Sequence, residues 1–153
     1  MHVALGTVAN KQGRVAGINI GGGYATFPGV LGTAITKVCN VEVARTGLTE
    51  REAAAVGFAA TAVTIDATTI AGYMPHAQPM TLKLVGERGT GRLLGAQIVG
   101  QDGSAKRIDT LATALHARLR VDELVDLDLA YAPPFSSVWD PVHLAARQLA
   151  PSL

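Results

Sequence analysis

The amino-acid sequence predicts an α+β fold in which an antiparallel sheet packs with helices. Segments typical of strands cluster in the middle of the chain and do not alternate regularly with helices, which argues against a doubly wound sheet. Two of these segments flank a glycine-containing turn, as the strands of a β-hairpin do. The length of 153 residues suits one domain with at most a short piece of another.

The first part of the chain predicts a helix, three strands and a short helix. Apolar residues follow a loose helical spacing over residues 5–20, and three consecutive glycines, residues 21–23, end that helix. Thr49 and Glu52 form a capping box that opens a short helix over residues 50–56. Three segments alternate in polarity and are rich in β-branched residues, as strands are: residues 34–39, 41–45 and 58–66.

The second part of the chain predicts a hairpin followed by helices. The hairpin strands are expected at residues 80–86 and 92–99, joined by a glycine-rich turn. Three helical segments follow, each with a start signal or an apolar helical spacing: residues 104–119 with Ser104 as N-cap, residues 121–124, and residues 140–149 with Asp140 as N-cap and Pro141 in the first turn.

Between the last two helical segments lies a proline-rich apolar stretch, LAYAPPFSSVWDPV, at residues 129–142. Proline fixes φ and removes a backbone donor, so this stretch is neither a helix interior nor a central strand. Its aromatic residues, Tyr131, Phe135 and Trp139, suit packing against another surface. We therefore expect a rigid loop that holds Tyr131 in a fixed position.

Composition and charge restrict the kinds of partner. Hydrophobic residues make up 48% and charged residues only 16%, below the usual ~25%, so a partner subunit or neighbouring domain is expected to cover apolar surface. A net charge of +1 without a basic stripe argues against nucleic acid. No apolar run approaches the ~18 residues that span a membrane. Cys39 is the only cysteine, so no intramolecular disulfide can form, and a cytoplasmic location is expected.

Five segments, in order along the chain, resemble the flavin-dependent pyridine nucleotide–disulfide oxidoreductases. They are ANKQGRVAG at residues 9–17, VARTGLT at 43–49, AGYMP at 71–75, KRID at 106–109 and YAPPF at 131–135. The YAPP sequence stands where the glutathione reductase branch has a His-Pro-Thr arrangement. The resemblance is therefore to the branch with a single redox cysteine, which contains coenzyme A-disulfide reductases, NADH oxidases and NADH peroxidases.

This resemblance implies how the chain is organised. Residues 1–28 would be a remnant of an FAD-binding domain, and residues 29–153 would be the dimerisation domain with the fold of FAD/NAD-linked reductases. Such enzymes hold both cofactors in glycine-rich units, and residues 21–23 do not match the G-x-G-x-x-G spacing of those units. The redox cysteine of the family belongs to the flavin unit, so Cys39 is not expected to be the catalytic thiol.

The resemblance also implies which residues serve the active site. Tyr131 would reach across the dimer and donate a hydrogen bond beside the partner's redox cysteine, with Tyr73 paired to it. The alternatives are an interface tyrosine that only packs, for Tyr131, and a surface-loop tyrosine, for Tyr73. Thr7 and Ala9 would lie nearest the edge of the flavin.

Lys106 and Arg107 fall in the first turn of an expected helix, where the helix dipole disfavours positive charge. One interpretation is a compensating carboxylate, either Asp102 or Asp109. The other, implied by the resemblance, is that these two side chains bind a phosphate of coenzyme A. No metal site is expected, because four histidines show no ligand spacing with carboxylates or with Cys39: His2, His76, His116 and His143.

By resemblance, the full-length protein would be a homodimeric oxidoreductase that uses FAD and NAD(P)H to reduce a disulfide, a peroxide or oxygen. The chain alone is expected to bind neither cofactor and to be inactive, since both dinucleotide fingerprints are missing from it. The alternatives are a non-catalytic dimeric binding or assembly module, and one subunit of a split enzyme whose FAD and NAD(P)H domains lie on a separate chain.

Overall fold

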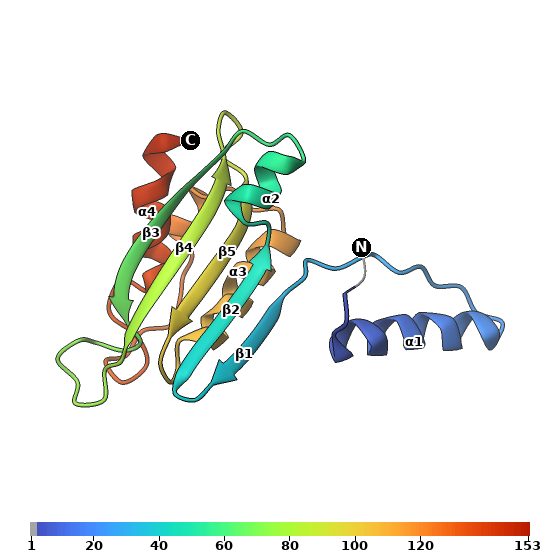
Figure 1. The fold of residues 1–153 in the computed structure, drawn as a ribbon, viewed down its shortest axis with the longest axis horizontal. Coiled ribbons are helices and arrows are strands. Elements are labelled where there is room, and N and C mark those ends of the chain that lie inside the picture. The colour runs from blue at the N-terminus through green and yellow to red at the C-terminus, as the bar shows by residue number, and fades with distance from the viewer. Residues whose placement is uncertain (1–2) are drawn as a thin grey trace.

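The computed structural model describes residues 3–153, and Met1 and His2 lie outside the described residues. Figure 1 shows one sheet with helices against one of its faces and a further helix set apart. The strands are β1 (Ala34–Val38), β2 (Val41–Gly47), β3 (Ala60–Thr68), β4 (Pro79–Glu87) and β5 (Leu93–Gly100). The helices are α1 (Gly6–Ile20), α2 (Glu50–Ala55), α3 (Ile108–His116) and α4 (Pro141–Leu149), with 3₁₀ turns at Ala105–Arg107, Glu123–Asp126 and Ala150–Ser152.

The five strands form one antiparallel sheet in the order β1-β2-β5-β4-β3. The side chains of the hairpin β4–β5 point alternately to the two faces of the sheet. One face is covered by α3 and α4, and part of the other is covered by α2, where Ala53 packs against Val85 and Leu94. Helix α3 packs against β2 and β5, whereas α4 packs against β3 and β4. This arrangement confirms the α+β class and the expected antiparallel sheet.

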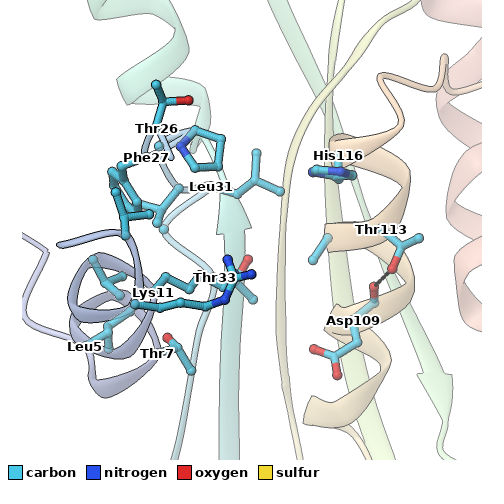
Figure 2. A pocket seen from close by; sticks show the side chains of 18 residues that line it. Leu5, Thr7, Lys11, Thr26, Phe27, Leu31, Thr33, Asp109, Thr113 and His116 are labelled. Atoms are coloured by element: carbon cyan, nitrogen blue, oxygen red, sulfur yellow. Dashed lines mark hydrogen bonds between the residues drawn. The ribbon is translucent and has the colours of Figure 1, made fainter. Parts of the chain in front are cut away.

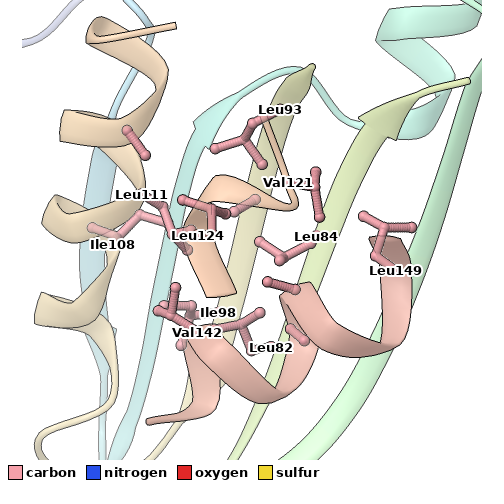
Figure 3. Close-up of a cluster of buried hydrophobic side chains, with 14 of the residues drawn as sticks. Leu82, Leu84, Leu93, Ile98, Ile108, Leu111, Val121, Leu124, Val142 and Leu149 are labelled. Carbon is pink, nitrogen blue, oxygen red and sulfur yellow. The ribbon is translucent and has the colours of Figure 1, made fainter. Parts of the chain in front are cut away.

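The core lies between the sheet and helices α3 and α4 (Figure 3). Leu82, Leu84 and Ile98 point from the central strands toward the helices and are fully buried. Each such side chain contributes about 1.5–3 kcal/mol of hydrophobic stabilisation. The helices supply the opposite side of the core: Ile108, Leu111, Val142 and Leu149.

Two expected helix starts are confirmed in atomic detail. Thr49 accepts a hydrogen bond from the Glu52 amide and Glu52 accepts one from the Thr49 amide, which completes the capping box of α2. The Arg45 guanidinium and these capping bonds lower the pKa of Glu52 to about 2. At the start of α4, Asp140 accepts a hydrogen bond from the Val142 amide, as the N-cap assignment predicts.

The expected helix from Ser104 to Leu119 is wrong at both ends. Ser104 already has helical backbone angles and makes no capping bond; its buried hydroxyl has no hydrogen-bond partner among the described residues. Instead, the Glu42 carboxylate on β2 accepts from the Ala105 amide at 3.0 Å, so the cap is a tertiary contact. The helix ends early because Arg118 adopts a left-handed φ of 59°.

Helix α1 lies beyond the β1 edge of the sheet and is joined to it by an extended segment (Figure 1). Val8 is its one buried residue. The separation of α1 from the sheet is in keeping with a boundary near residue 28, which stays a prediction. None of the helices in residues 3–153 is both long and apolar enough to cross a membrane.

Candidate functional site

The two loops that carry the tyrosines lie side by side at one end of the sheet. The first loop, residues 69–78, connects β3 to β4, and the second, residues 127–140, leads into α4. A backbone hydrogen bond joins them directly, from the Ala71 amide to the Pro133 carbonyl at 3.1 Å. Segments that are distant in sequence therefore form one surface.

Tyr73 and Tyr131 are both exposed on this surface, with 75% and 48% of their area accessible. Partial burial raises the pKa of the Tyr131 phenol above its usual value, and the neighbouring Tyr73 phenol raises it further. Tyr131 therefore remains protonated, and remains a hydrogen-bond donor, at neutral pH. The structure thus brings together the two tyrosines that the sequence singled out, and neither is buried in the core.

Local hydrogen bonds hold each loop in one conformation. At the base of the first loop, Thr69 donates its amide to the Gln78 carbonyl at 2.9 Å and accepts from the Gln78 amide through its hydroxyl. In the second loop, the amides of Phe135 and Ser136 both donate to the Ala132 carbonyl, which closes a tight turn that contains the two prolines. These contacts, with the fixed φ of proline, present Tyr131 on a rigid backbone.

The Arg107 side chain connects the two loops through hydrogen bonds. Its guanidinium donates to the Thr69 carbonyl at 2.6 Å and to the Phe135 carbonyl at 3.2 Å, one from each loop. It also forms an ion pair with Asp140, with Nε to Oδ2 at 3.0 Å. Only 12% of the Arg107 side chain is exposed, so its charge is directed into the protein.

Lys106 lies in a different environment from its neighbour Arg107. Its side chain is exposed and pairs with Asp109, one of the two carboxylates that the sequence suggested. The other, Asp102, pairs with Lys37. Phosphate binding by Lys106 and Arg107 stays a prediction, and of the two only the Lys106 ammonium faces solvent.

Thr7 and Ala9 are not near the tyrosine loops. Thr7 lines a groove of about 890 Å³ between α1, residues 26–33 and α3, and Figure 2 shows it opposite Asp109 and His116. Ala9 lines an adjoining hollow under the start of α1. Of the residues described, none that lines this groove belongs to either tyrosine loop.

Among residues 3–153, Cys39 and the histidines form no site of their own. Cys39 is exposed in the turn between β1 and β2, where its φ of 54° is left-handed. His143 is buried in α4, where its Nε2 lies 2.9 Å from the Leu127 carbonyl. Within residues 3–153, no three histidine, cysteine or acidic side chains are placed to hold a metal ion.

Sequence reasoning missed the links from Arg107 to both loops. The capping role of Asp140 was visible in the Asp-Pro pair, but its ion pair joins residues that are distant in the chain. It also missed the stacking of the Arg147 guanidinium on the Trp139 ring, 4.5 Å from the ring centroid. A periodic apolar pattern cannot indicate either contact, because both depend on how the loop folds back onto the helices.

The described residues form an α+β domain that carries two exposed tyrosines on adjoining loops. Residues 33–142 match the family described as pyridine nucleotide-disulphide oxidoreductase, dimerisation domain. The chain belongs to this family.

The chain is similar to several curated proteins and to solved structures. It is 48% identical over 147 residues to an NAD(P)H coenzyme A polysulfide/persulfide reductase of Pyrococcus horikoshii, an alignment that covers 96% of the chain and 33% of that protein. It is 34% identical over 118 residues to a coenzyme A disulfide reductase of Staphylococcus epidermidis, covering 77% of the chain and 26% of that protein. The structure of an NAD-dependent persulfide reductase from A. fulgidus superposes with a TM-score of 0.95 at 45% identity, covering 99% of the chain and 28% of that structure. The chain thus spans about a third of the length of the curated relatives it matches.

Proposed function

We propose that the chain is the dimerisation domain of an FAD-dependent NAD(P)H oxidoreductase that reduces a coenzyme A disulfide or persulfide. In this function, Tyr131 and Tyr73 of one subunit serve the active site of the other. The observation that carries the proposal is the convergence of two exposed phenols from separate loops, held by a direct backbone hydrogen bond. The identity of 48% to a coenzyme A polysulfide/persulfide reductase, against 36% to an NADH oxidase of Methanocaldococcus jannaschii, favours a sulfur substrate over oxygen.

The Tyr131 hydroxyl would act on the sulfur that leaves. When a thiolate attacks a disulfide, a new S–S bond forms, the old one breaks, and negative charge collects on the departing sulfur. A fixed O–H donor stabilises that charge more in the transition state than in the bound disulfide. The raised pKa of Tyr131 keeps its proton in place for this role.

A second subunit would cover the surface around the tyrosines. Phe135, Val138 and Trp139 are large apolar side chains that remain exposed beside Tyr131. Exposed apolar patches of this kind are typical of interfaces between protein chains. A symmetric homodimer would bury them and bring the two phenols against the partner.

The described residues supply only one edge of a flavin site. Helix α1 begins without a side-chain cap and without an acidic residue in its first turn, so the positive end of its dipole is open. Thr7 and Ala9 in this turn fit the electron-rich edge of a flavin, which accepts hydride from NAD(P)H and passes electrons to sulfur. The rest of the FAD and NAD(P)H sites would come from other domains, on the same polypeptide or on a separate chain.

A fusion enzyme tests the proposal. In it, the chain replaces the matching segment of the Pyrococcus horikoshii reductase, whose own flavin and nicotinamide domains remain. We expect a flavin-loaded dimer that oxidises NAD(P)H in the presence of coenzyme A disulfide, at a rate comparable to that of the unmodified reductase. A fusion enzyme that is folded, dimeric and flavin-loaded but does not turn over would contradict the proposal.

A further inference from the structure

The contacts of Arg107 are those of a clamp between the two tyrosine loops. Its Nη2 donates to one carbonyl from each loop, Thr69 and Phe135, and its Nη1 donates to the Gly103 carbonyl at 3.2 Å. A planar guanidinium can hold several acceptors in a fixed geometry, which the single ammonium of lysine cannot reproduce.

Asp140 completes the clamp from the other side. Its Oδ2 accepts from Arg107 Nε at 3.0 Å and from the Ser136 hydroxyl at 3.0 Å, while its Oδ1 caps α4 through the Val142 amide. Only 13% of its side chain is exposed. The carboxylate therefore fixes the end of the second loop to both Arg107 and the helix that follows.

The position of Arg107 is costly unless these bonds are made. It lies in the 3₁₀ turn that leads into α3, where the helix dipole disfavours a cation, and burial removes much of its hydration. A surface arginine would satisfy its charge with water. Arg107 is largely buried and donates its hydrogen bonds to both tyrosine loops. We therefore infer that the contacts between those loops depend on it.

We propose that Arg107, together with Asp140, is a positioning residue that locks the Tyr73 and Tyr131 loops against each other. Its consequence for catalysis rests on the proposed function; its consequence for the geometry of the tyrosine pair does not. The clamp maintains the hydrogen bond from the Ala71 amide to the Pro133 carbonyl, which joins the two loops that carry the phenols.

The test compares Arg107→Lys with Arg45→Lys in the chain itself. Arg107→Lys keeps the charge but loses the fork, so we expect amide exchange at Ala71 to become about tenfold faster relative to exchange at the Leu93 amide, which lies outside both loops. In ¹³C spectra of ring-labelled tyrosine, the pKa of Tyr131 should fall toward the ordinary value of about 10. Because the charge is retained, this fall reports a loosened loop and not a lost cation.

Arg45→Lys is the matched control. The Arg45 guanidinium also donates to a carboxylate and a carbonyl, those of Glu52 and Gly47, but these contacts link β2 to α2 and involve neither tyrosine loop. Its replacement should leave the Ala71 exchange ratio and the Tyr131 pKa unchanged. If Arg107→Lys leaves both readouts at their original values, the clamp does not exist.

The fusion enzyme separates a positioning role from phosphate binding. For a positioning residue, Arg107→Lys should lower kcat about tenfold with little change in KM for coenzyme A disulfide. For a phosphate ligand, KM should rise while the Ala71 exchange ratio stays constant, and that result would overturn the inference. An inactive fusion enzyme whose loops still loosen in Arg107→Lys would refute the proposed function and leave the clamp intact.

Discussion

Replacing Tyr131 by phenylalanine in the fusion enzyme is expected to lower kcat about a hundredfold. The change removes one hydroxyl donor from the point where negative charge develops, and the loss of one such donor costs 10²–10³ in rate in enzymes where it has been measured, or about 2.7–4 kcal/mol. Tyr131 is half-exposed and the change removes a single oxygen atom, so the free energy of unfolding should change by less than about 0.5 kcal/mol. Steady-state kinetics and urea unfolding measure the two effects separately.

Two further variants show whether this loss belongs to the tyrosine pair. Tyr73→Phe should reduce kcat by a smaller factor, about tenfold, because Tyr73 acts beside the principal donor. Tyr24→Phe removes the same hydroxyl from an exposed position next to α1, outside both loops, and should leave kcat unchanged. Full activity in Tyr131→Phe would make Tyr131 a packing residue, as the alternative interpretation of the sequence holds.

Replacing Gly95 by alanine is expected to destabilise the domain by about 3 kcal/mol or more, the upper range for overpacking a core. A Cβ at this position would lie 2.1 Å from the Leu48 carbonyl oxygen and 2.5 Å from the Leu48 amide nitrogen. Both are backbone atoms, and the Leu48 amide is held by its bond to the Leu94 carbonyl at 2.9 Å. The chain can relieve the clash only by separating the end of β2 from β5, and urea unfolding would report this as a lower midpoint.

The residue that pairs with Gly95 shows why β2 and β5 approach each other closely here. Gly47 pairs with Gly95 across β2 and β5 and has a φ of 63°, and a Cβ there would lie 2.3 Å from the Leu94 carbonyl oxygen. The matched control is Gly72→Ala in the first tyrosine loop, where a Cβ would meet nothing closer than 3.8 Å. That variant should stay within about 0.5 kcal/mol of the original chain. If Gly95→Ala leaves the stability unchanged, the backbone around Leu48 can accommodate a Cβ at position 95, and the close approach of β2 and β5 is not required for stability.

Much of the fold follows from local patterns in the sequence. Alternation and β-branched residues identify β1, β2 and β3, and the glycine-containing turn identifies the hairpin β4–β5. The Thr49 and Asp140 signals locate the starts of α2 and α4. The order of the strands in the sheet does not follow, because β2 pairs with β5 through contacts far apart in the chain. The predicted start of α3 was wrong for the same reason, because the capping carboxylate is that of Glu42 on β2 and not the hydroxyl of the neighbouring Ser104.

For the candidate site too, the sequence indicated individual residues but not the contacts between distant segments. Tyr131 and Tyr73 were found by resemblance, and Tyr131 also by the prolines around it. No sequence signal near Tyr73 or Tyr131 predicts that their loops lie side by side. The carboxylate that compensates Arg107 is Asp140 instead of Asp102 or Asp109, because the loop after Tyr131 folds back over the turn that carries Arg107. The two candidate tyrosines could be chosen from the sequence, whereas the contacts between their loops are visible only in the structure.

Mixed dimers of the fusion enzyme test the central claim most directly. One subunit carries Tyr131→Phe with the redox cysteine of the family intact; the other carries intact tyrosines with that cysteine replaced by serine. If Tyr131 serves the partner's active site, each mixed dimer contains one complete site and should show about half of the original turnover, although both parental homodimers are nearly inactive. Mixed dimers no more active than those homodimers would show that Tyr131 does not act across the interface.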